Sequence, residues 1–570
     1  MSSRSIDIEF AQISEPNMDR VRTLGSVRLT REGTNERILY PKPSNDPNDP
    51  LNWSKAYKIY LMSLTSTALV LSNFMAAGPS IAIVELTIDI FHAYPPSPLI
   101  PGSFAPASIA RFSSSISKAA YLFSATALLQ GISNLFWVPV ALKYGRRKVY
   151  VLSFLLFGVT TIWASRANSF GNLLAARLVM GWFAGTAECV APLTVADLFF
   201  LHERGTYMAI FAAALAAGAP LGSIVGGLFT LGTDWRALYY LGTGLIFAFT
   251  ILAFFTMPET AFVRVQEVHE LTLVRQSSKD IEKPLSALQV ERLPLEPSVE
   301  ISNIPKKTFR QNLAFVTPPQ TGESFWKIFI RPVLLLVLPP VIWATVSIGL
   351  VVGIVVVLSV SLANDFHTIY QFEIWQSGLC WIAVIIGTAI GMPVCGKLTD
   401  VTADFFTIRN GGIREPEHRL PFSILPALFL PGGLLMYGFE LYRGYHWAVP
   451  VVGLGLISVG IVGGTTGPMA YIVDAYRPIA GECVVSIMAF KSAFAFLIAF
   501  YTNSWLKSDG PAVIFGTLAG IISVWFALAL PLYIWGKQLR QKSLDWKFVR
   551  LIQWDLDRET GERGGFGELL

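Results

Sequence analysis

Residues 332–364 read PVLLLVLPPVIWATVSIGLVVGIVVVLSVSLAN and contain no Asp, Glu, Lys or Arg. A helix needs about 20 predominantly apolar residues to cross the hydrocarbon core of a bilayer. A helix also satisfies its own backbone hydrogen bonds there, which an isolated strand does not. This stretch therefore predicts a membrane-spanning helix.

Similar apolar stretches, a few of them interrupted by single charges, recur on both sides of this one. None shows the alternating pattern of an outer-membrane β-barrel. Together with 332–364 they predict an all-α membrane protein with twelve transmembrane helices. The other eleven stretches are 59–84, 119–142, 149–165, 172–196, 206–233, 237–258, 374–396, 420–439, 447–473, 480–505 and 511–536.

The composition agrees with a membrane protein. Of the 570 residues, 53% are hydrophobic and 15% are charged, whereas soluble domains carry about 25% charged residues. These values exclude a soluble enzyme, a disordered chain and a coiled coil. The net charge of +5 is expected from cytoplasmic loops and indicates no nucleic-acid partner. The four cysteines lie in or beside apolar stretches, so we expect no disulfide framework, no metal site and no cofactor.

Lysine and arginine are unevenly distributed between the loops, which decides the orientation. Lys143, Arg146, Arg147 and Lys148 lie within six residues, and segment 261–327 holds nine basic residues. Because basic loops stay in the cytoplasm, both termini are predicted to be cytosolic. The expected division is a cytosolic N-terminal tail (1–56), an N-terminal six-helix half (57–260), a cytosolic linker (261–326), a C-terminal six-helix half (327–536) and a cytosolic C-terminal tail (537–570).

Several short motifs follow one another in this topology. In chain order they are Gly145-Arg146-Arg147-Lys148, Arg177-x3-Gly181, Gly218-x3-Gly222-x3-Gly226-Gly227, Pro258-Glu259-Thr260 and Gly396-Lys397-Leu398-Thr399-Asp400. Over about residues 45–545 the chain resembles the major facilitator superfamily, specifically its fungal twelve-span drug:proton antiporter branch. The resemblance implies two pseudo-symmetric six-helix halves, a binding site near the middle of the membrane, alternating access coupled to protons, and a monomer in the cell membrane.

Two departures from the family pattern bear on the direction of transport. Val138 and Leu142 stand where the first loop motif has Gly and Asp, so the usual acidic partner of Arg146 and Arg147 is missing from this half. Gly222 is followed by Ser223 where the antiporter motif has Gly-Pro. These differences leave an importer open beside an antiporter.

Charged residues inside the spans are the sharpest functional signal, because they are costly in hydrocarbon and usually face a cavity. Arg177 and Glu188 are eleven residues apart, which places them within about 20° of each other around a helix. Glu188 is a candidate proton carrier or cation ligand, and the resemblance assigns Arg177 to proton coupling. Lys491 lies near the middle of its span and is expected to reach a cavity or to pair with Glu188. A structural hydrogen-bonded pair with a neighbouring helix is the alternative for Arg177 and Glu188, and snorkelling of the ammonium group to an interface is the alternative for Lys491.

Other residues are candidates by type and spacing. Gly218, Gly222, Gly226 and Gly227 form a smooth ridge that lets another helix approach closely. The glycine turn at Gly145, with Arg146 and Arg147, is expected to latch the cytoplasmic face, and Asp400 belongs to the second copy of this motif. Broken backbone is expected at Pro339-Pro340 and in the run 463–468. The polar and aromatic candidates for the substrate pathway are Asn73, Gln130, Asn134, Trp343 and Gln376.

The sequence thus predicts a secondary transporter that exports a small organic molecule, such as a drug, toxin or secondary metabolite, in exchange for protons. Proton-coupled uptake of polyamines or other organic cations is the alternative, and a transporter-like sensor is a remote one. No nucleophile–base pair or metal constellation is present, so we expect no enzyme. The partners expected are the substrate, protons and the lipid bilayer.

Overall fold

The computed structural model describes residues 43–94, 105–262 and 324–544, apart from 45, 201, 202, 230, 477 and 478, and also residues 27–28, 30–31, 34–37, 306–308, 311 and 546. Twelve helical segments in these ranges are long and apolar enough to cross a membrane, as the sequence predicts. Most of the expected linker and the outer parts of both tails lie outside the described residues. The domain boundaries of the sequence analysis therefore stay predictions.

The N-terminal half contains the first six spans. Its helices are α2 (Lys55–Ala77), η3 (Gly78–Ala82), α3 (Ile83–Phe91), α4 (Pro106–Ile132), α5 (Asn134–Tyr144), α6 (Arg146–Ser165), α7 (Phe170–Ala184), α8 (Thr186–Leu198), α9 (Arg204–Phe229) and α10 (Arg236–Thr256). The first, second and fourth spans each consist of two or three consecutive elements. The elements of these spans meet at Gly78, Ser133 and Gly185, which keep right-handed helical φ and ψ.

The C-terminal half begins with α13 (Phe325–Leu335), a short helix on the border of the two halves. Ser486 Oγ donates to the Pro332 carbonyl of α13 over 2.6 Å, and Phe325 packs against Phe136 of α5, with ring centroids 6.0 Å apart. The other helices are α14 (Pro339–Tyr370), α15 (Ile374–Leu379), α16 (Ile382–Arg409), η4 (Pro416–Ser423), α17 (Ile424–Arg443), α18 (Ala448–Ala475), α19 (Ala480–Ala527) and α20 (Ala529–Leu544). The segment labelled α19 holds two spans that meet at Gly510, where φ is 78°.

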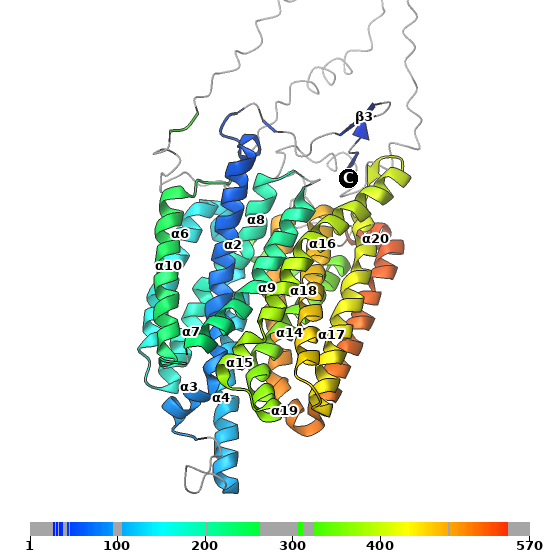
Figure 1. Ribbon diagram of the computed structural model, residues 1–570. Helices are drawn as coiled ribbons and strands as arrows, with labels where there is room; N and C mark the ends of the chain where they lie inside the picture. Colours follow the sequence, from blue (N-terminus) through cyan, green and yellow to red (C-terminus); the bar gives the residue numbers. More distant parts are fainter. Residues whose placement is uncertain are drawn as a thin grey trace, which may run out of the picture.

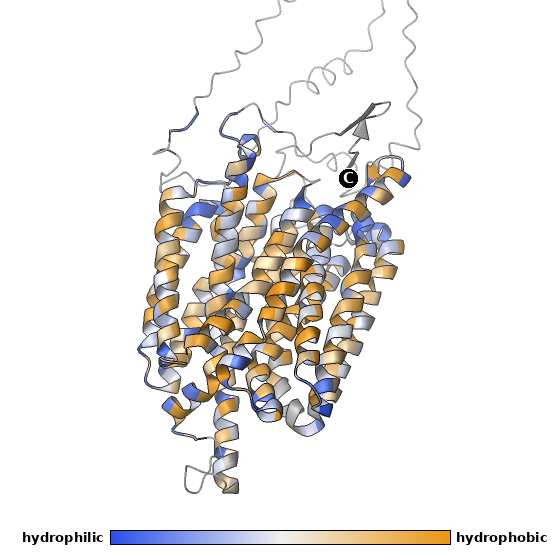
Figure 2. Cartoon of the chain, viewed as in Figure 1, coloured by the Kyte–Doolittle hydropathy of each residue, from blue (hydrophilic) through white to orange (hydrophobic). Residues whose placement is uncertain are grey.

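The two halves lie side by side. Figure 1 shows α2 to α10 on one side and α14 to α20 on the other, with α9 and α16 packed together along the border. The start of α2 and the end of α20 lie at the same end of the bundle. Apolar residues cover the middle of the helices and hydrophilic residues gather at the ends (Figure 2). This distribution is the one that a bilayer requires.

Short strands occur beside the bundle. β1 (Val27–Arg28) pairs antiparallel with β4 (Ile413–Arg414), and β2 (Thr30–Arg31) pairs with β3 (Thr34–Arg37). The first pairing joins a piece of the N-terminal tail to the connection between α16 and α17.

The chain breaks at one of the two expected weak points: α13 ends at Leu335, Leu338 is extended with ψ of 125°, and α14 begins at Pro339. The break expected in the run 463–468 is wrong. Pro339 and Pro340 occupy the first turn of α14, where the missing N–H groups have no intrahelical acceptor anyway and the fixed φ suits a helix. The run 463–468 lies within the continuous helix α18, including Pro468. Pro468 does not interrupt α18 because, in a membrane span, neighbouring helices and side chains can satisfy the backbone groups that a proline leaves without partners.

Candidate functional site

A cavity lies on the border between the two halves and is lined by residues of both. The N-terminal half contributes α2, α4, α8 and α9, and the C-terminal half contributes α14, α18 and α19. The cavity volume is about 60 Å³, whereas sites for drug-sized ligands measure about 300–1,000 Å³. The structure therefore holds this site in a closed, occluded arrangement.

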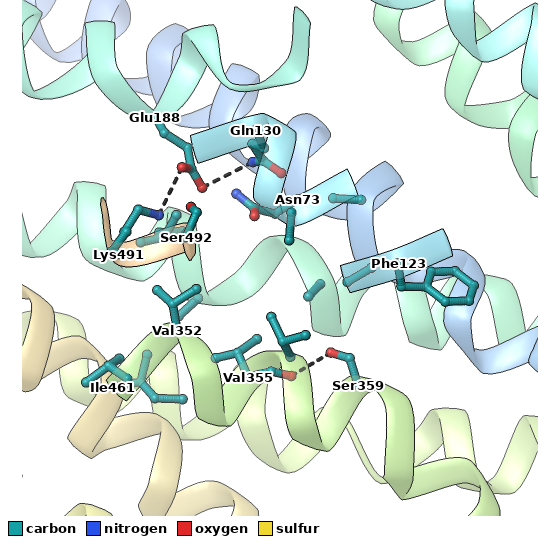
Figure 3. Close-up of a pocket in the computed structure, with 18 of the residues that line it drawn as sticks. Asn73, Phe123, Gln130, Glu188, Val352, Val355, Ser359, Ile461, Lys491 and Ser492 are labelled. Atoms are coloured by element: carbon teal, nitrogen blue, oxygen red, sulfur yellow. Dashed lines mark hydrogen bonds and ion pairs between the residues drawn. The ribbon is translucent and has the colours of Figure 1, made fainter. Parts of the chain in front are cut away.

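A buried ion pair forms the polar wall of the cavity. Glu188 Oε2 of α8 lies 2.9 Å from Lys491 Nζ of α19, and their side chains are 4% and 1% exposed. Gln130 Nε2 of α4 donates to Glu188 Oε1 over 3.1 Å. Figure 3 shows the three side chains meeting, with Ser492 beside Lys491. The pair joins one half of the molecule to the other.

The opposite wall is apolar. Val352 and Val355 of α14 face the cavity, with Ile461 of α18 beside them (Figure 3). Phe123 is the one aromatic side chain among the lining residues. The site thus offers an aliphatic surface opposite one carboxylate and one ammonium group. A bound molecule could place an apolar body on the first and a polar group on the second.

Close packing at two glycines brings the polar groups together. Gly185, between α7 and α8, packs on the Gln130 carbonyl and on Ser133, so that a Cβ there would collide with both. Gly131 of α4 packs equally closely on Ser492 of α19. Because these contacts need glycine, the sequence fixes how near α4 lies to α8 and α19. The carboxylate, amide and ammonium can then meet inside the bundle.

The stability of this ion pair depends on both of its charges being present. Taking two charges out of water costs several kcal/mol per ion, and the attraction between them offsets that cost only while both are present. Removing one partner of such a pair typically costs about 3–5 kcal/mol. A change that neutralises Glu188, or draws Lys491 away, therefore disturbs the contact between the halves.

Arg177 lies behind the cavity rather than in its wall. It is fully buried and donates from Nη1 to the Ala76 carbonyl over 3.0 Å. Its guanidinium lies 4.5 Å from the ring centroid of Phe123 and 5.3 Å from that of Tyr239. Among the described residues no carboxylate is within ion-pair distance of it. Arg177 thus binds the end of α2 at the break before η3, where helix carbonyls lack intrahelical partners.

The other predicted pathway residues lie in different places. Asn73 lines the cavity (Figure 3). Asn134 is fully buried at the start of α5 but is not among the lining residues. Trp343 exchanges hydrogen bonds with Trp525 within the C-terminal half. Gln376 accepts a hydrogen bond from the Glu373 backbone at the start of α15. Roles for these residues in transport stay predictions.

The glycine ridge of α9 packs against the first span. A Cβ on Gly222 would lie 2.6 Å from the Phe74 carbonyl oxygen and 2.7 Å from Gly78 Cα. Gly218 is equally close to Asn73. Gly226 packs on Ile81 of η3, at the same break. The ridge thus holds α2 and its break inside the N-terminal half.

Gly227 instead faces the other half. A Cβ on Gly227 would lie 3.3 Å from Gly378 Cα of α15. Nearby, Ser80 Oγ of η3 donates to the Ser359 carbonyl of α14 over 2.8 Å. These contacts join the halves at the end of the bundle away from the basic loops.

The basic turn before α6 is held by carboxylates. Arg146 Nε lies 3.1 Å from Asp197 at the end of α8. Glu259 accepts hydrogen bonds from the backbone N–H groups of Arg146 and Arg147, at 2.8 and 3.3 Å. Gly145, with φ of 98°, packs directly on Glu259. Asp197 and Glu259 therefore hold this turn, which carries Leu142 where the family has an aspartate.

The second copy of the motif keeps its aspartate and contacts both halves. Asp400 lies 3.0 Å from Arg419 Nη1, and Arg419 Nε lies 2.6 Å from Asp474. Thr206 of α9, in the other half, donates to Asp400 over 3.2 Å. Burial, aided by the charge of Arg419, lowers the pKa of Arg414 in the same cluster to about 10. Asp400 thus joins the halves on the side of the basic loops.

Sequence reasoning missed the apolar wall and some ion-pair partners. Val352 and Val355 carry no signal that separates a cavity face from a lipid face, because every residue from 348 to 358 is apolar. Arg419, which links Asp400 to Asp474, lies in a polar loop where its burial is not visible from sequence. The loop between α16 and α17 brings Arg419 close to Asp400 in space. Helical periodicity in the sequence does not predict the path of a loop.

The chain is similar to known transporters over most of its length. The sequence profile of the Major Facilitator Superfamily matches residues 59–500. The MFS transporter cpaT of Aspergillus oryzae is 26% identical, covering 91% of this chain and 95% of that protein. The efflux pump FUBT of Fusarium oxysporum is 25% identical, covering 72% of this chain and 64% of that protein.

Among solved structures, the proton:xylose symporter XylE bound to 6-bromo-6-deoxy-D-glucose shares the fold. The TM-score is 0.54 at 15% identity, with 85% of this chain and 96% of that chain covered. This multi-pass membrane protein therefore belongs to the major facilitator superfamily of transporters, as its twelve spans and the profile match over most of the chain show.

Proposed function

We propose that the protein exports a small organic molecule across the plasma membrane in exchange for protons. The observation that carries the proposal is the Glu188–Lys491 ion pair, which lies on the cavity and joins the two halves. A titratable group in that position can link proton binding to the movement of the halves. Export is supported by the similarity to the efflux pump FUBT.

The pair suggests how coupling works. While the halves are together, Glu188 contacts both Lys491 of the C-terminal half and Gln130 of its own half. When the halves part, Lys491 moves away with α19 while Gln130 stays with Glu188 in the N-terminal half. Glu188 then lacks its ionic partner, and in the proposed exchange a proton takes the place of the Lys491 charge. Proton binding and opening therefore favour each other.

Substrate binding uses the same arrangement. The closed cavity is too small for an organic molecule, so α14 and α19 must move away from α4 and α8 before one enters. The aliphatic face of α14 then binds its apolar part, and Gln130, Asn73 or the ion-pair residues bind its polar group. Alternation between proton and substrate at one site yields exchange.

Uptake of organic cations is the second candidate. Glu188 already holds one ammonium group, that of Lys491, so an amine substrate could take the same position. The Gly222-Ser223 pair, which stands where the antiporter motif has Gly-Pro, also separates this chain from the antiporter pattern. The two candidates differ in whether substrate and protons move in opposite directions or together.

Flux in sealed liposomes decides between them. The purified chain is reconstituted with a pH-sensitive dye inside, and organic compounds are added one at a time under an imposed pH gradient. Exchange predicts that a transported compound moves against the proton flux, and that Glu188→Gln abolishes this coupling. A compound that moves together with protons supports the uptake candidate. Transport that is unaffected when the gradient is collapsed contradicts proton coupling.

A further inference from the structure

The charges around the substrate cavity do not balance. Glu188 and Lys491 are the two charged residues among those that line it, and they form an ion pair with each other. Arg177 is fully buried behind the wall of the cavity, and no carboxylate of the described residues lies within ion-pair distance of it. The surroundings of the cavity therefore carry one unbalanced positive charge.

The guanidinium group of Arg177 uses part of its hydrogen-bonding capacity. Nη1 donates to the Ala76 carbonyl over 3.0 Å and lies 3.5 Å from the Met75 carbonyl. Nε and Nη2 have no hydrogen-bond partner in the part of the chain that the structure describes. Together they form the planar edge with which an arginine binds both oxygens of one carboxylate. The edge that suits a carboxylate is thus the one without a partner.

The neighbours of Arg177 stabilise a cation without neutralising it. Its guanidinium lies 4.5 Å from the ring centroid of Phe123 and 5.3 Å from that of Tyr239, and aromatic faces attract cations. The Tyr239 hydroxyl, which interacts electrostatically with Arg177, is a neutral group. A buried ion is costly unless an opposite charge accompanies it. An anion that reaches the free edge supplies that charge.

Phe123 separates this edge from the cavity. Phe123 and Ala76 both line the cavity, and both contact Arg177. Figure 3 shows Phe123 at the opposite end of the site from Lys491. A phenylalanine ring changes rotamer by rotation about single bonds, so the backbone can stay in place. Because the cavity must widen before any organic molecule enters, the same step gives Phe123 room to turn away from Arg177.

We propose that the transported substrate is an organic anion and that Arg177 binds its carboxylate. The apolar body of the substrate lies on Val352 and Val355 of α14, and the carboxylate takes the place of the Phe123 ring beside the guanidinium. The inference rests on the proposed function only in taking this cavity as the substrate site. It does not depend on proton coupling or on the direction of transport. An organic cation, by contrast, would meet the unbalanced positive charge.

Equilibrium binding tests the proposal without a proton gradient. The full-length chain in detergent is titrated with three compounds of one skeleton, 4-tert-butylbenzoate, 4-tert-butylbenzamide and 4-tert-butylbenzylamine. The rise of the unfolding temperature with concentration gives the affinity of each. We expect the benzoate to bind about ten-fold more tightly than the amide, because hydrogen bonds to charged groups are stronger than those between neutral groups. The amine should bind most weakly.

Variants show whether Arg177 is responsible. Arg177→Gln should weaken benzoate binding about ten-fold and leave amide binding unchanged. Arg177→Lys, which also serves if Arg177→Gln does not fold, keeps the charge but lacks the planar pair of donors, so it should restore part of the affinity. Arg236→Gln is the matched control. Arg236 also lies over an aromatic ring, that of Trp235, but it pairs with Asp89 and does not line the cavity, so its loss should leave benzoate binding unchanged.

The outcomes separate this inference from the proposed function. Equal binding of the benzoate and the amide, stronger binding of the amine, or no binding of the benzoate overturns the inference. Unchanged benzoate affinity in Arg177→Gln also overturns it, because Arg177 would then only hold the end of α2. Loss of proton coupling in the liposome experiment has no bearing on these affinities, so the failure of one proposal is distinguishable from the failure of the other.

Discussion

Single charged residues in apolar spans gave the most useful signal at the residue scale. Glu188 and Lys491 stand out in the sequence because a charge in hydrocarbon is costly, and they lie 2.9 Å apart across the cavity. Arg177, on the same stripe of the fourth span by helical spacing, lies instead behind Phe123 and binds the end of α2. Gly185 keeps helical φ and ψ of −59° and −25°, so the eleven residues from Arg177 to Glu188 correspond to about 16 Å along the helix axis. Helical spacing places the two on one stripe but at different depths in the span.

Replacing Glu188 by Gln should separate coupling from folding. The variant keeps the shape of the side chain but leaves the Lys491 ammonium without a carboxylate, which costs about 3–5 kcal/mol. We therefore expect a lower unfolding temperature and loss of transport driven by a pH gradient. Counterflow exchange, which moves no net proton, should survive better. Normal transport with the original pH dependence would make Glu188 a structural residue.

The second member of the pair provides a check on the same reasoning. Adding Lys491→Met to Glu188→Gln removes both charges and replaces the lysine by an apolar side chain of similar length. Replacing a buried ion pair by apolar residues is often neutral or stabilising. Thermal unfolding of the double variant should therefore recover much of the stability lost by Glu188→Gln alone. If the two losses add instead, the residues do not act as a pair.

At the scale of the element, small residues decide which helices approach closely. The sequence predicts a tight contact for the ridge at Gly218, Gly222 and Gly226, and the structure places it against α2 and η3. Spacing along one helix shows that a ridge exists but does not name its partner, because the partner depends on the packing of all the spans. For the same reason the sequence does not predict that helical elements meet at Gly78 and Ser133. It does predict the twelve apolar stretches.

A methyl group at Gly222 should be costly. It would lie 2.6 Å from the Phe74 carbonyl oxygen and 2.7 Å from Gly78 Cα, which are backbone atoms that cannot turn aside. Overpacking of this kind costs about 1–3 kcal/mol. Gly222→Ala should therefore lower the unfolding temperature. Gly520→Ala is the control, since nothing lies within 4 Å of a Cβ there; equal effects of the two substitutions would contradict the packing argument.

At the scale of the whole molecule, the two halves contact each other on both sides of the cavity. Asp400 and Thr206 meet on the side of the basic loops, and Gly227 and Gly378 meet on the other. The number of spans and the division into halves follow from hydropathy and from the polar segment in the middle of the chain. The contacts between the halves do not, because they join residues far apart in sequence.

A covalent link between the halves should stop transport. Gly227→Cys combined with Gly378→Cys places two thiols at the contact away from the basic loops. Oxidation should form a disulfide that prevents opening on that side, and reduction should restore flux. After cleavage of the chain within the linker, this disulfide should hold the two fragments together on a non-reducing gel. Each single variant serves as a control for the cost of the substitution itself. Full flux in the oxidised double variant would show that the halves do not separate there.

The small volume of the closed cavity has a consequence for ion leakage. With about 60 Å³ of space, the cavity holds at most a few water molecules, too few to join the two sides of the membrane in a continuous file. A carrier that resets through this arrangement passes from one side to the other without opening a conducting path. The electrical resistance of the membrane is then preserved during every empty return.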